Sequence, residues 1–365
     1  MTRDKSSGRK RPPAAEPATG PAPATPRKIG GLKEVAARAG TSIPTASRVL
    51  NGLGDEYRIS RRTQELVRRA AAELNFSPNL LAKSLRLGST RTIGLVLPDV
   101  GNPFFAAIAR AVSTEAHARG YSVVLCDTGD DTSREIELLE VILNRRPDGL
   151  IVVPVGQQCS HLQGFEAAEP PLVLVDRSFP ELRLPAVTSD NRQGARDAVN
   201  HLIECGHRAI ACLRGLAGTT PNELRLQGYR EALEAHGIPF DEHLVVGDGF
   251  GKEAGRRAAL DLLDSGAPFT AVFALSNLIG IAALEVLLEA GRRVPEDVSL
   301  VSFDEQPYSS VLAVPMSTVR QDPAEMGRLA VAMLCDQIGK PPGSNPASVV
   351  VPTAFVPRRS IAIHT

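Results

Sequence analysis

The most informative polar residues lie in the segment 32–51, which reads LKEVAARAGTSIPTASRVLN. Gly40 interrupts one helical pattern, and Ser42, Thr45 and Arg48 follow at the start of a second. A helix that enters the major groove of DNA needs a tight turn before it, a polar N-terminal end that meets phosphates, and side chains on its first turns that reach base edges. The spacing therefore predicts a helix-turn-helix that binds DNA.

Motifs of known enzymes and metal sites are missing from the sequence. It contains no GxSxG, no Walker loop and no HExxH, and the glycines of 247–251 (GDGFG) have the wrong spacing for a dinucleotide fingerprint. The five cysteines form no CxxC pair, and the seven histidines are not clustered as zinc requires. We expect no enzymatic activity, no cofactor and no metal, with 247–251 forming a turn before the next helix.

Charge is unevenly distributed along the chain, although the total is zero. Residues 1–91 contain 18 Lys/Arg against 7 Asp/Glu, a net charge of +11. Residues 92–365 contain 23 against 34, a net charge of −11. A basic end joined to an acidic body is the layout expected of a protein whose end binds phosphates while its body has another task.

A length of 365 residues and a hydrophobic content of 43% fit two or three globular domains. No apolar stretch approaches the roughly 18–20 residues that cross a bilayer, which excludes a membrane protein. Near the N-terminus, basic residues are followed by Pro, Ala and Gly instead of the continuous apolar segment of a secretory signal. We therefore expect the protein in the cytoplasm.

The DNA-binding pattern requires a small helical unit near the N-terminus. Residues 1–28 have almost no bulky apolar side chains, so they predict a disordered basic tail. After this tail, apolar residues recur at three- and four-residue spacing on both sides of Gly40, and again from the N-cap Ser60 to Leu74. Three short helices of this kind can bury one small core.

From Thr92 onward, short apolar runs alternate with amphipathic segments. The predicted strands cover residues 93–97, 122–126, 149–153, 172–175, 208–213, 244–246, 271–274 and 299–303. The predicted helices cover residues 104–119, 132–145, 192–205, 223–236, 252–265 and 279–290. This alternation predicts two doubly wound parallel sheets with a ligand cleft between two lobes, at the carboxyl ends of the strands.

Four segments, in order, resemble the LacI family of bacterial transcription regulators. They read LKEVAARAGTSIPTASRVLNG, ISRRTQELVRRAAAELNFSPNLLAKSLR, TIGLVLPDVGNPFFAAIARAVSTEAHARGYSVVLCDT and VPEDVSLVSFDE. The resemblance covers essentially everything after the tail and implies an all-α helix-turn-helix head on a two-lobed α/β body of the periplasmic-binding-protein type. The implied parts are the tail (1–28), the head (29–76), a hinge helix and linker (77–91) and the body (92–365), with lobes of about 92–190 plus 322–349 and about 191–321 plus 350–365.

The resemblance assigns residues 43–50 to the recognition helix. Ile43, Pro44 and Arg48 would face base edges, and Thr45, Ser47 and Asn51, with Ser42 at the helix start, would hold the phosphate backbone. Ile43 and Pro44 depart from the polar or aromatic residues that many members carry, so base contact there would be apolar, against a thymine methyl. The loop Gly52–Ile59 is also about three residues longer than is usual in the family.

The segment Pro78–Leu87 precedes Gly88 and, on its own pattern, predicts a short amphipathic linker helix. The resemblance implies more: a hinge helix that pairs with its dimer mate and orders on the operator. In that role Leu85 would wedge into the minor groove at a central base step and bend the DNA.

The resemblance also implies a set of residues that bind a small-molecule effector in the cleft. Phe104 or Phe105 would stack on the effector, Arg225 would bind it, and Asp304 would accept its hydroxyl groups. Asn277 stands where Asp is frequent and keeps only the acceptor. Further implied contacts are Asp176, Arg177, Phe250, Asn277 and Gln321.

Together these inferences predict a sequence-specific regulator, most simply a repressor that binds a palindromic operator as a homodimer. A small molecule, with a sugar or sugar derivative favoured, would control its affinity for double-stranded DNA. The alternatives are an activator or dual regulator with a nucleoside, purine or other metabolite as effector, an enzyme with a fused DNA-binding head, and a solute-binding protein. A solute-binding protein would carry a signal peptide and no basic head, which is the reverse of this sequence.

Overall fold

The computed structural model describes residues 31–76, 89–166, 170–341 and 347–364. The chain divides into two compact units, Met1–Lys83 and Ser84–Thr365. The tail at 1–28 and the hinge segment around Leu85, both predicted from the sequence, lie outside the described residues.

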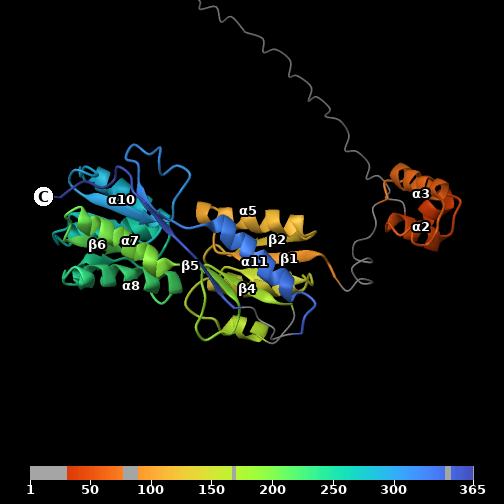
Figure 1. Ribbon diagram of the computed structural model, residues 1–365, viewed down its shortest axis with the longest axis horizontal. Coiled ribbons are helices and arrows are strands. Elements are labelled where there is room, and N and C mark those ends of the chain that lie inside the picture. Colours follow the sequence, from red (N-terminus) through yellow and green to blue (C-terminus); the bar gives the residue numbers. More distant parts are fainter. Residues whose placement is uncertain (1–30, 77–88, 167–169, 342–346, 365) are drawn as a thin grey trace, which may run out of the picture. The chain divides into compact units, whose positions relative to one another are not determined.

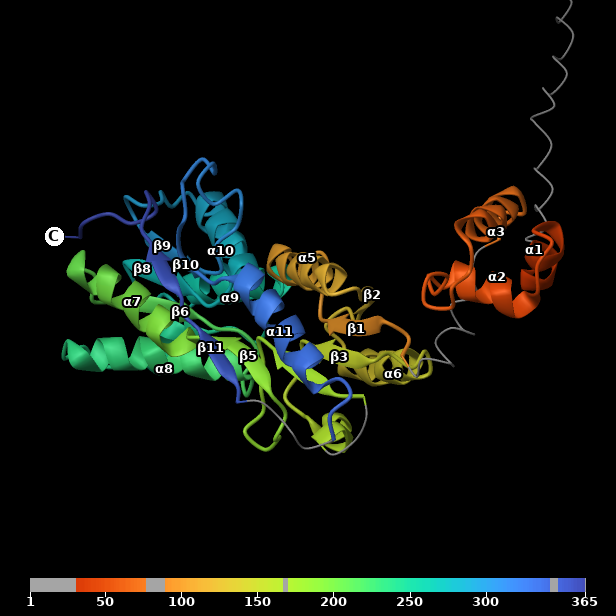
Figure 2. The ribbon, with the colours of Figure 1, turned by 45° about the vertical axis from the view of Figure 1, so that its right-hand side comes forward.

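The described part of the first unit consists of helices α1 (Leu32–Arg38), α2 (Ile43–Leu50) and α3 (Arg61–Glu73), labelled in Figure 2. Gly40 has a φ of +63°, the left-handed conformation that glycine adopts without steric cost, and it turns the chain between α1 and α2. This is the predicted helix-turn-helix.

Serine side chains cap the second and third helices of this unit. Ser42 accepts a hydrogen bond from the backbone N–H of Thr45 at 3.3 Å, and Ser60 accepts one from the N–H of Thr63 at 3.2 Å. Small apolar side chains from all three helices share one core, made of Val35, Ala36, Ala46, Val49, Val67, Ala70 and Ala71. The caps fix where α2 and α3 begin, and the core fixes how they cross.

The first lobe of the second unit is a six-stranded parallel sheet with the strand order β11-β5-β4-β3-β1-β2. The strands are β1 (Thr92–Leu97), β2 (Ser122–Asp127), β3 (Gly149–Val152), β4 (Leu172–Val175), β5 (Ala186–Ser189) and β11 (Val349–Val351). Helices α5 (Pro103–Ala118) and α11 (Pro323–Gln337) lie side by side, as Figure 1 shows. Alternate residues of β1 enter opposite cores: Ile93 and Leu95 pack with α5 and α11, and Val96 packs with α6 (Thr132–Leu143).

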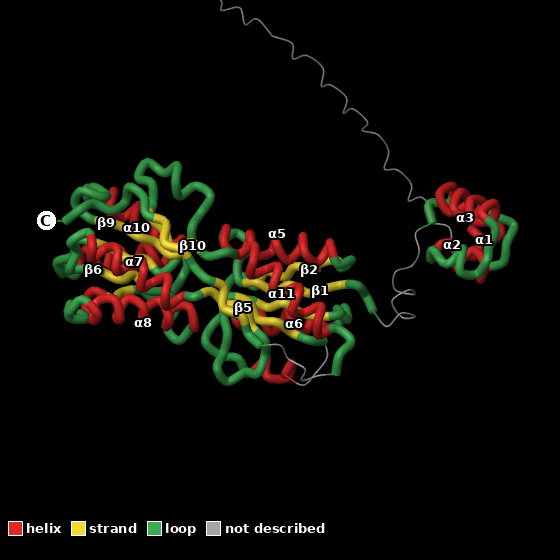
Figure 3. The backbone as a smooth tube through the Cα atoms, viewed as in Figure 1, coloured by secondary structure: helices red, strands yellow, loops and turns green. Residues whose placement is uncertain are grey.

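The second lobe repeats this plan of a sheet between helices (Figure 3). Its strand order is β12-β10-β9-β8-β6-β7. Its strands are β6 (Ile210–Leu213), β7 (Val245–Val246), β8 (Ala271–Ala274), β9 (Ser299–Phe303), β10 (Ser317–Arg320) and β12 (Ala354–Val356). Its helices are α7 (Asn191–Glu204), α8 (Thr220–Ala235), α9 (Lys252–Asp264) and α10 (Asn277–Glu289). Helices α7 and α8 pack on one core of the sheet and α9 and α10 on the other, and β12 runs antiparallel to β10. Short 3-10 helices, η1 (Ser160–Glu166) and η2 (Glu242–Leu244), complete the two lobes.

The chain crosses between the lobes three times, after β5, after β10 and between β11 and β12. The last crossing follows Val351, slightly beyond the position near 349 that the sequence predicted, because β11 still pairs with β5. The two doubly wound sheets agree with the predicted fold class. Sequence reasoning did not identify β5, β10, β11, β12 or α11.

Candidate nucleic-acid interface and ligand pocket

The start of α2 presents the side chains that the sequence assigned to base contacts. Ile43 is 45% exposed although it is apolar, and Pro44 and Arg48 are also exposed. Their neighbours Ala46 and Val49 are buried in the core of the unit. One face of α2 is therefore anchored while the opposite face is open to solvent, which is the geometry that groove recognition needs.

The polar residues around this face are partly paired with one another. Ser42 caps the helix, and its Oγ also lies 2.8 Å from Thr45 Oγ1. At the other end, Asn51 Nδ2 donates to the backbone carbonyl of Ser47 at 2.7 Å. The guanidinium of Arg48 makes no hydrogen bond or ion pair within the described residues, so its donors are free.

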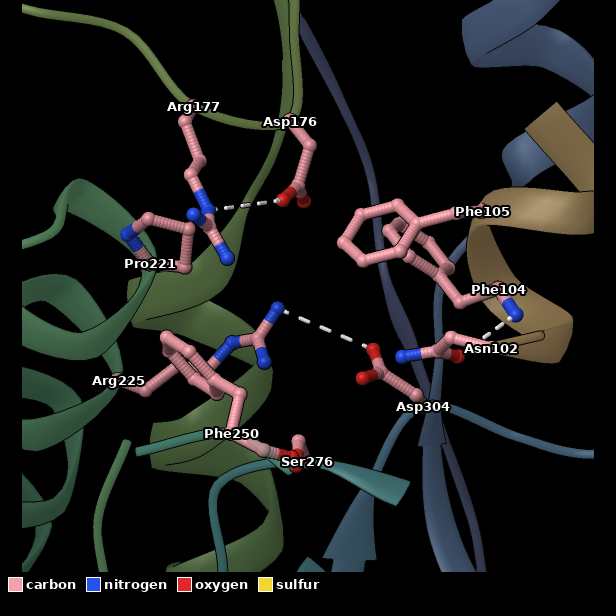
Figure 4. Close-up of a pocket in the computed structure, with 10 residues that line it drawn as sticks. All are labelled: Asn102, Phe104, Phe105, Asp176, Arg177, Pro221, Arg225, Phe250, Ser276 and Asp304. Carbon is pink, nitrogen blue, oxygen red and sulfur yellow. Dashed lines mark hydrogen bonds and ion pairs between the residues drawn. The ribbon is translucent and has the colours of Figure 1, made fainter. Parts of the chain in front are cut away.

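A pocket with an empty volume of about 330 Å³ lies between the two lobes of the second unit. It is lined by Asn102, Phe104, Phe105, Asp176, Arg177, Pro221, Arg225, Phe250, Ser276 and Asp304 (Figure 4). The side chains come from loops at the carboxyl ends of strands and from the first two turns of the helices that follow, where doubly wound sheets bind ligands.

On the side of the second lobe, Arg225 of α8 is buried and held in place. Its Nε donates to Asn191 Oδ1 at 2.7 Å and its Nη1 to the carbonyl of Leu275 at 2.6 Å. Its guanidinium carbon lies 3.7 Å from the centre of the Phe303 ring. Burial lowers the pKa of Arg225, against the opposing effect of nearby carboxylates, Asp304 first.

Asp304 directly follows β9 and faces Arg225, with Oδ1 3.8 Å from Nη2. Its carboxylate also accepts a hydrogen bond from Gln321 Nε2. Burial raises the pKa of Asp304, while the Arg225 guanidinium and the hydrogen bond from Gln321 oppose this shift. The second lobe thus holds a buried charge pair whose members both have other polar partners.

On the side of the first lobe, Asp176 directly follows β4 and Arg177 comes next. Arg177 Nη1 donates to the carbonyl of Pro154 at 3.0 Å, and its Nε lies 3.9 Å from Asp176 Oδ2, too far for a hydrogen bond. Within the described residues, Asp176 Oδ1 and Arg177 Nε are buried and have no hydrogen-bond partner. Burial raises the pKa of Asp176, and the neighbouring guanidinium groups of Arg225 and Arg177 only partly oppose it.

Three phenylalanine rings make the apolar part of the pocket. Phe104 and Phe105, from the first turn of α5, contact each other edge to face with ring centres 5.3 Å apart. In Figure 4 they face Arg225 and Pro221 across the pocket. Phe250 lies with its ring centre 5.5 Å from the guanidinium carbon of Arg177. The pocket therefore combines flat apolar walls with buried hydrogen-bonding groups.

Two residues predicted from the sequence lie beside the pocket, not in its lining. Gln321 supports Asp304 from behind, and its own Oε1 is buried without a partner in the described residues. Asn277, the first residue of α10, donates from Nδ2 to Asn102 Oδ1 at 3.0 Å and so bridges the two lobes. Both residues are positioned to orient lining groups.

Sequence reasoning did not identify three lining residues, Asn102, Pro221 and Ser276. Asn102 and Ser276 cap α5 and α10 through hydrogen bonds to the N–H groups of Phe104 and Ile279. An N-cap within a few residues of the end of a buried strand marks the carboxyl edge of a parallel sheet, so this signal could have identified both. Pro221, at the first turn of α8, carries no chemical signal of its own.

The described parts of the chain contain no metal-binding cluster and no helix suited to span a membrane. No group of three or more His, Cys, Asp or Glu residues could hold a metal ion among them. None of their helices is both long and apolar enough to cross a membrane.

Known proteins resemble both units. Residues 31–79 match the family described as "Bacterial regulatory proteins, lacI family", and residues 199–361 match the "Periplasmic binding protein-like domain". The HTH-type transcriptional regulator DegA of Bacillus subtilis (strain 168) is 34% identical over 299 residues, which cover 81% of this chain and 88% of DegA. This similarity extends through both units.

Two solved structures are similar over most of the chain. The complex of the transcriptional regulator CelR with cellobiose is 35% identical with a TM-score of 0.69, covering 91% of this chain and 99% of that chain. The lac repressor dimer bound to operator and the anti-inducer ONPF is 26% identical with a TM-score of 0.81, covering 92% of this chain and 100% of that chain. One of these structures holds a sugar and the other is bound to its operator.

Proposed function

Because the chain belongs to the LacI family of bacterial regulatory proteins, we propose that it regulates transcription by coupling two binding events. The helix-turn-helix unit binds a specific DNA site, and a small molecule in the pocket between the lobes changes the affinity for that site. The protein acts as a repressor. Its assigned base contacts are Ile43, Pro44 and Arg48, with backbone contacts from Ser42, Thr45, Ser47 and Asn51.

One observation carries the ligand half of this proposal. Asp176 Oδ1 and Arg177 Nε are buried beside the pocket without hydrogen-bond partners in the described residues. Leaving a buried polar group unpaired costs about 1–3 kcal/mol, more for charged groups. A ligand that donates to the carboxylate and accepts from the guanidinium recovers this free energy. The pocket is therefore best explained as a binding site.

The chemistry of the pocket favours a sugar or sugar derivative as the effector. Hydroxyl groups can donate to Asp176 and Asp304 and accept from Arg177 and Arg225, and the apolar face of a sugar ring can lie against the phenylalanine rings. The similar CelR structure contains cellobiose, a sugar.

Coupling between pocket and DNA requires two arrangements of the lobes, because a ligand shifts only states that it binds with different affinity. Side-chain hydrogen bonds already link the lobes near the pocket, among them Asn277 Nδ2 to Asn102 Oδ1 and Thr220 Oγ1 to the carbonyl of Ser178. A ligand that strengthens or breaks these contacts changes how the first lobe meets its partner subunit. The hinge residue Leu85, proposed to wedge into the minor groove, transmits that change to DNA.

We propose that the protein is a homodimer on a palindromic site. The lac repressor structure that it resembles is a dimer. Strand β2 is an edge strand, and it carries Leu125, an apolar side chain that is 42% exposed. Val100, 47% exposed, lies nearby because its N–H donates to Asp127 Oδ2 at the end of β2. This apolar edge supports contact with a second copy.

A DNA-binding regulator of this kind works in the cytoplasm and needs no catalytic step.

The proposal is tested by selecting bound sequences from a random DNA pool with the purified full chain, with and without a panel of sugars and nucleosides. We expect a palindromic motif whose enrichment changes with one compound. Arg48→Ala is the matched control: it should lose the motif and keep the ligand response, measured as ligand-induced thermal stabilisation. If the wild type enriches no motif under any condition, the proposed function is wrong.

A further inference from the structure

The loop between α2 and α3, residues 52–59, is held in one conformation by a buried glutamine. Gln64 of α3 is 5% exposed, and its Nε2 donates to Asp55 Oδ1 at 2.8 Å and to the carbonyl of Ile59 at 3.0 Å. Its Oε1 accepts from Arg68 Nη2 at 3.1 Å. A single side chain thus ties the middle of the loop to its end.

The start of the same loop is fixed against the end of α2. The backbone N–H of Leu53 donates to the carbonyl of Arg48 at 2.9 Å, and the N–H of Tyr57 donates to the carbonyl of Leu53 at 3.1 Å. Gly54 is buried against Gln64, and a Cβ at this glycine would lie only 2.5 Å from Gln64 Cδ. The fit between Gly54 and Gln64 therefore sets where the following residues lie.

This conformation places the ring of Tyr57 against Arg48. The guanidinium carbon of Arg48 lies 4.0 Å from the centre of the ring, within the distance of a cation–π contact. Tyr57 is 47% exposed, so this ring is not needed to fill the core. Within the described residues the guanidinium makes no hydrogen bond or ion pair, so its N–H donors remain available beside the ring.

Arg48 is also the side chain on this surface with the most donors to offer. Ile43 and Pro44 have no polar side-chain group, and Ser42 and Thr45 are hydrogen-bonded to each other. Asn51 is engaged with the backbone of Ser47. Discrimination between bases by hydrogen bonding therefore depends mainly on Arg48, whose fork matches guanine O6 and N7.

We propose that Tyr57 is a positioning residue for base recognition: its ring holds the Arg48 guanidinium in the orientation that reads a guanine in the major groove. The inference rests on the proposed function. Stacking restricts an otherwise flexible side chain before it binds, so less conformational entropy is lost when the base contact forms. The loop thereby contributes to specificity through Arg48, without a base contact of its own.

The test measures dissociation constants of the full chain for its selected DNA site and for variants of that site in which each guanine is replaced in turn. Tyr57→Ala should lower the discrimination at one guanine by about two- to fivefold, the range of an exposed cation–π contact. Tyr57→Phe, which keeps the ring, should restore it. Arg48→Ala should lower the discrimination at the same base pair by at least as much. Adding Tyr57→Ala to Arg48→Ala should lower it no further. Affinity for random DNA should stay unchanged.

Two further variants separate positioning from a general structural role. Gly54→Ala keeps both Tyr57 and Arg48 in the sequence but displaces Gln64 and the loop that it holds, so it should reduce discrimination at the same guanine. Tyr308→Ala, which removes another partly exposed tyrosine, this one in the second unit, should have no such effect.

Each unfavourable result identifies what is wrong. Discrimination that survives in Tyr57→Ala overturns this inference and leaves the proposed function intact. Equal losses on all DNA, or a Tyr57→Phe variant that behaves like Tyr57→Ala, would show that the hydroxyl binds the phosphate backbone instead. A wild type that discriminates between no sites overturns the inference together with the proposed function.

Discussion

The two aspartates of the pocket occupy equivalent places in their lobes, yet their surroundings differ. Asp176 directly follows β4, Asp304 directly follows β9, and both have a φ of 67°. Asp304 and its partner Arg225 each have further hydrogen bonds within the protein. Asp176 faces Arg177 at 3.9 Å, and one polar atom of each lacks a partner in the described residues.

This difference shows which charges belong to the scaffold and which are left for a ligand. The Arg225 guanidinium joins Asn191 at the start of α7 to Leu275 at the end of β8, so it stabilises the second lobe with or without ligand. The Asp176 carboxylate gains less from its surroundings, because one of its oxygens has no hydrogen-bond partner in the described residues. Such a residue contributes more to ligand binding than to stability.

The largest expected effect is on stability, at Arg225. Arg225→Met leaves Asp304 without its countercharge and breaks the bonds to Asn191 and Leu275, so it should reduce the free energy of unfolding by about 3–5 kcal/mol. Urea unfolding followed by circular dichroism measures the change. Arg328→Met is the matched control, because Arg328 pairs with Glu325 on an exposed helix surface and should cost less than about 1 kcal/mol.

A second substitution tests the cause of the loss at Arg225. Adding Asp304→Asn to Arg225→Met removes the uncompensated charge, so the double variant should recover part of the lost stability. If Arg225→Met lowers the free energy of unfolding no more than Arg328→Met does, the pair of Arg225 and Asp304 does not stabilise the second lobe, and the contrast drawn with Asp176 is wrong.

The next effect concerns ligand affinity at Asp176. Asp176→Asn keeps the shape of the side chain and removes a carboxylate that lacks a full set of partners. The free energy of unfolding should therefore change by less than about 1 kcal/mol. Effector affinity, measured by calorimetry, should fall about tenfold or more because a hydrogen bond to a charged group is lost. A large loss of stability with unchanged affinity would reverse the roles of the two aspartates.

The smallest effect is a pH dependence of stability. Burial raises the pKa of Asp176 above 3.8, so the native state retains its proton to higher pH than the unfolded state does. The free energy of unfolding should therefore fall as the pH rises from about 4 through the raised pKa, by at most about 1.4 kcal/mol per pH unit for one carboxyl. In Asp176→Asn this contribution should be absent. The free energy of unfolding of Asp176→Asn minus that of the wild type should therefore decrease as the pH is lowered through this range. An increase toward low pH contradicts the burial argument.

The sequence was most informative where function depends on one short segment. The helix-turn-helix could be predicted because Gly40, Ser42 and Arg48 lie within a single turn and helix, where spacing indicates the fold. The assignment of base contacts on it came from the family resemblance. The order of the body's elements was also readable, since buried parallel strands are continuous apolar runs. The strands β10 and β12 could not be recognised, because each is too short to show a clear apolar pattern.

The pocket was less predictable because it is assembled from segments far apart in the chain. Family resemblance brought Arg225 and Asp304 together, but spacing gives no sign that Gln321 supports Asp304 or that Asn277 bonds to Asn102 across the lobes. The position of Tyr57 was equally hidden. Its contact with Arg48 depends on how Gln64 folds the intervening loop, a packing effect that no local pattern encodes.

The central claim is that occupancy of the pocket controls DNA binding, and one measurement tests it most directly. The affinity of the full chain for its selected DNA site is measured by fluorescence anisotropy as the identified effector is titrated, for the wild type and for Asp176→Asn. The wild-type dissociation constant should change by at least about fivefold, the lower end of typical allosteric coupling. In Asp176→Asn the same change should require higher effector concentrations. An effector that binds the pocket to saturation and leaves DNA affinity unchanged would contradict the account.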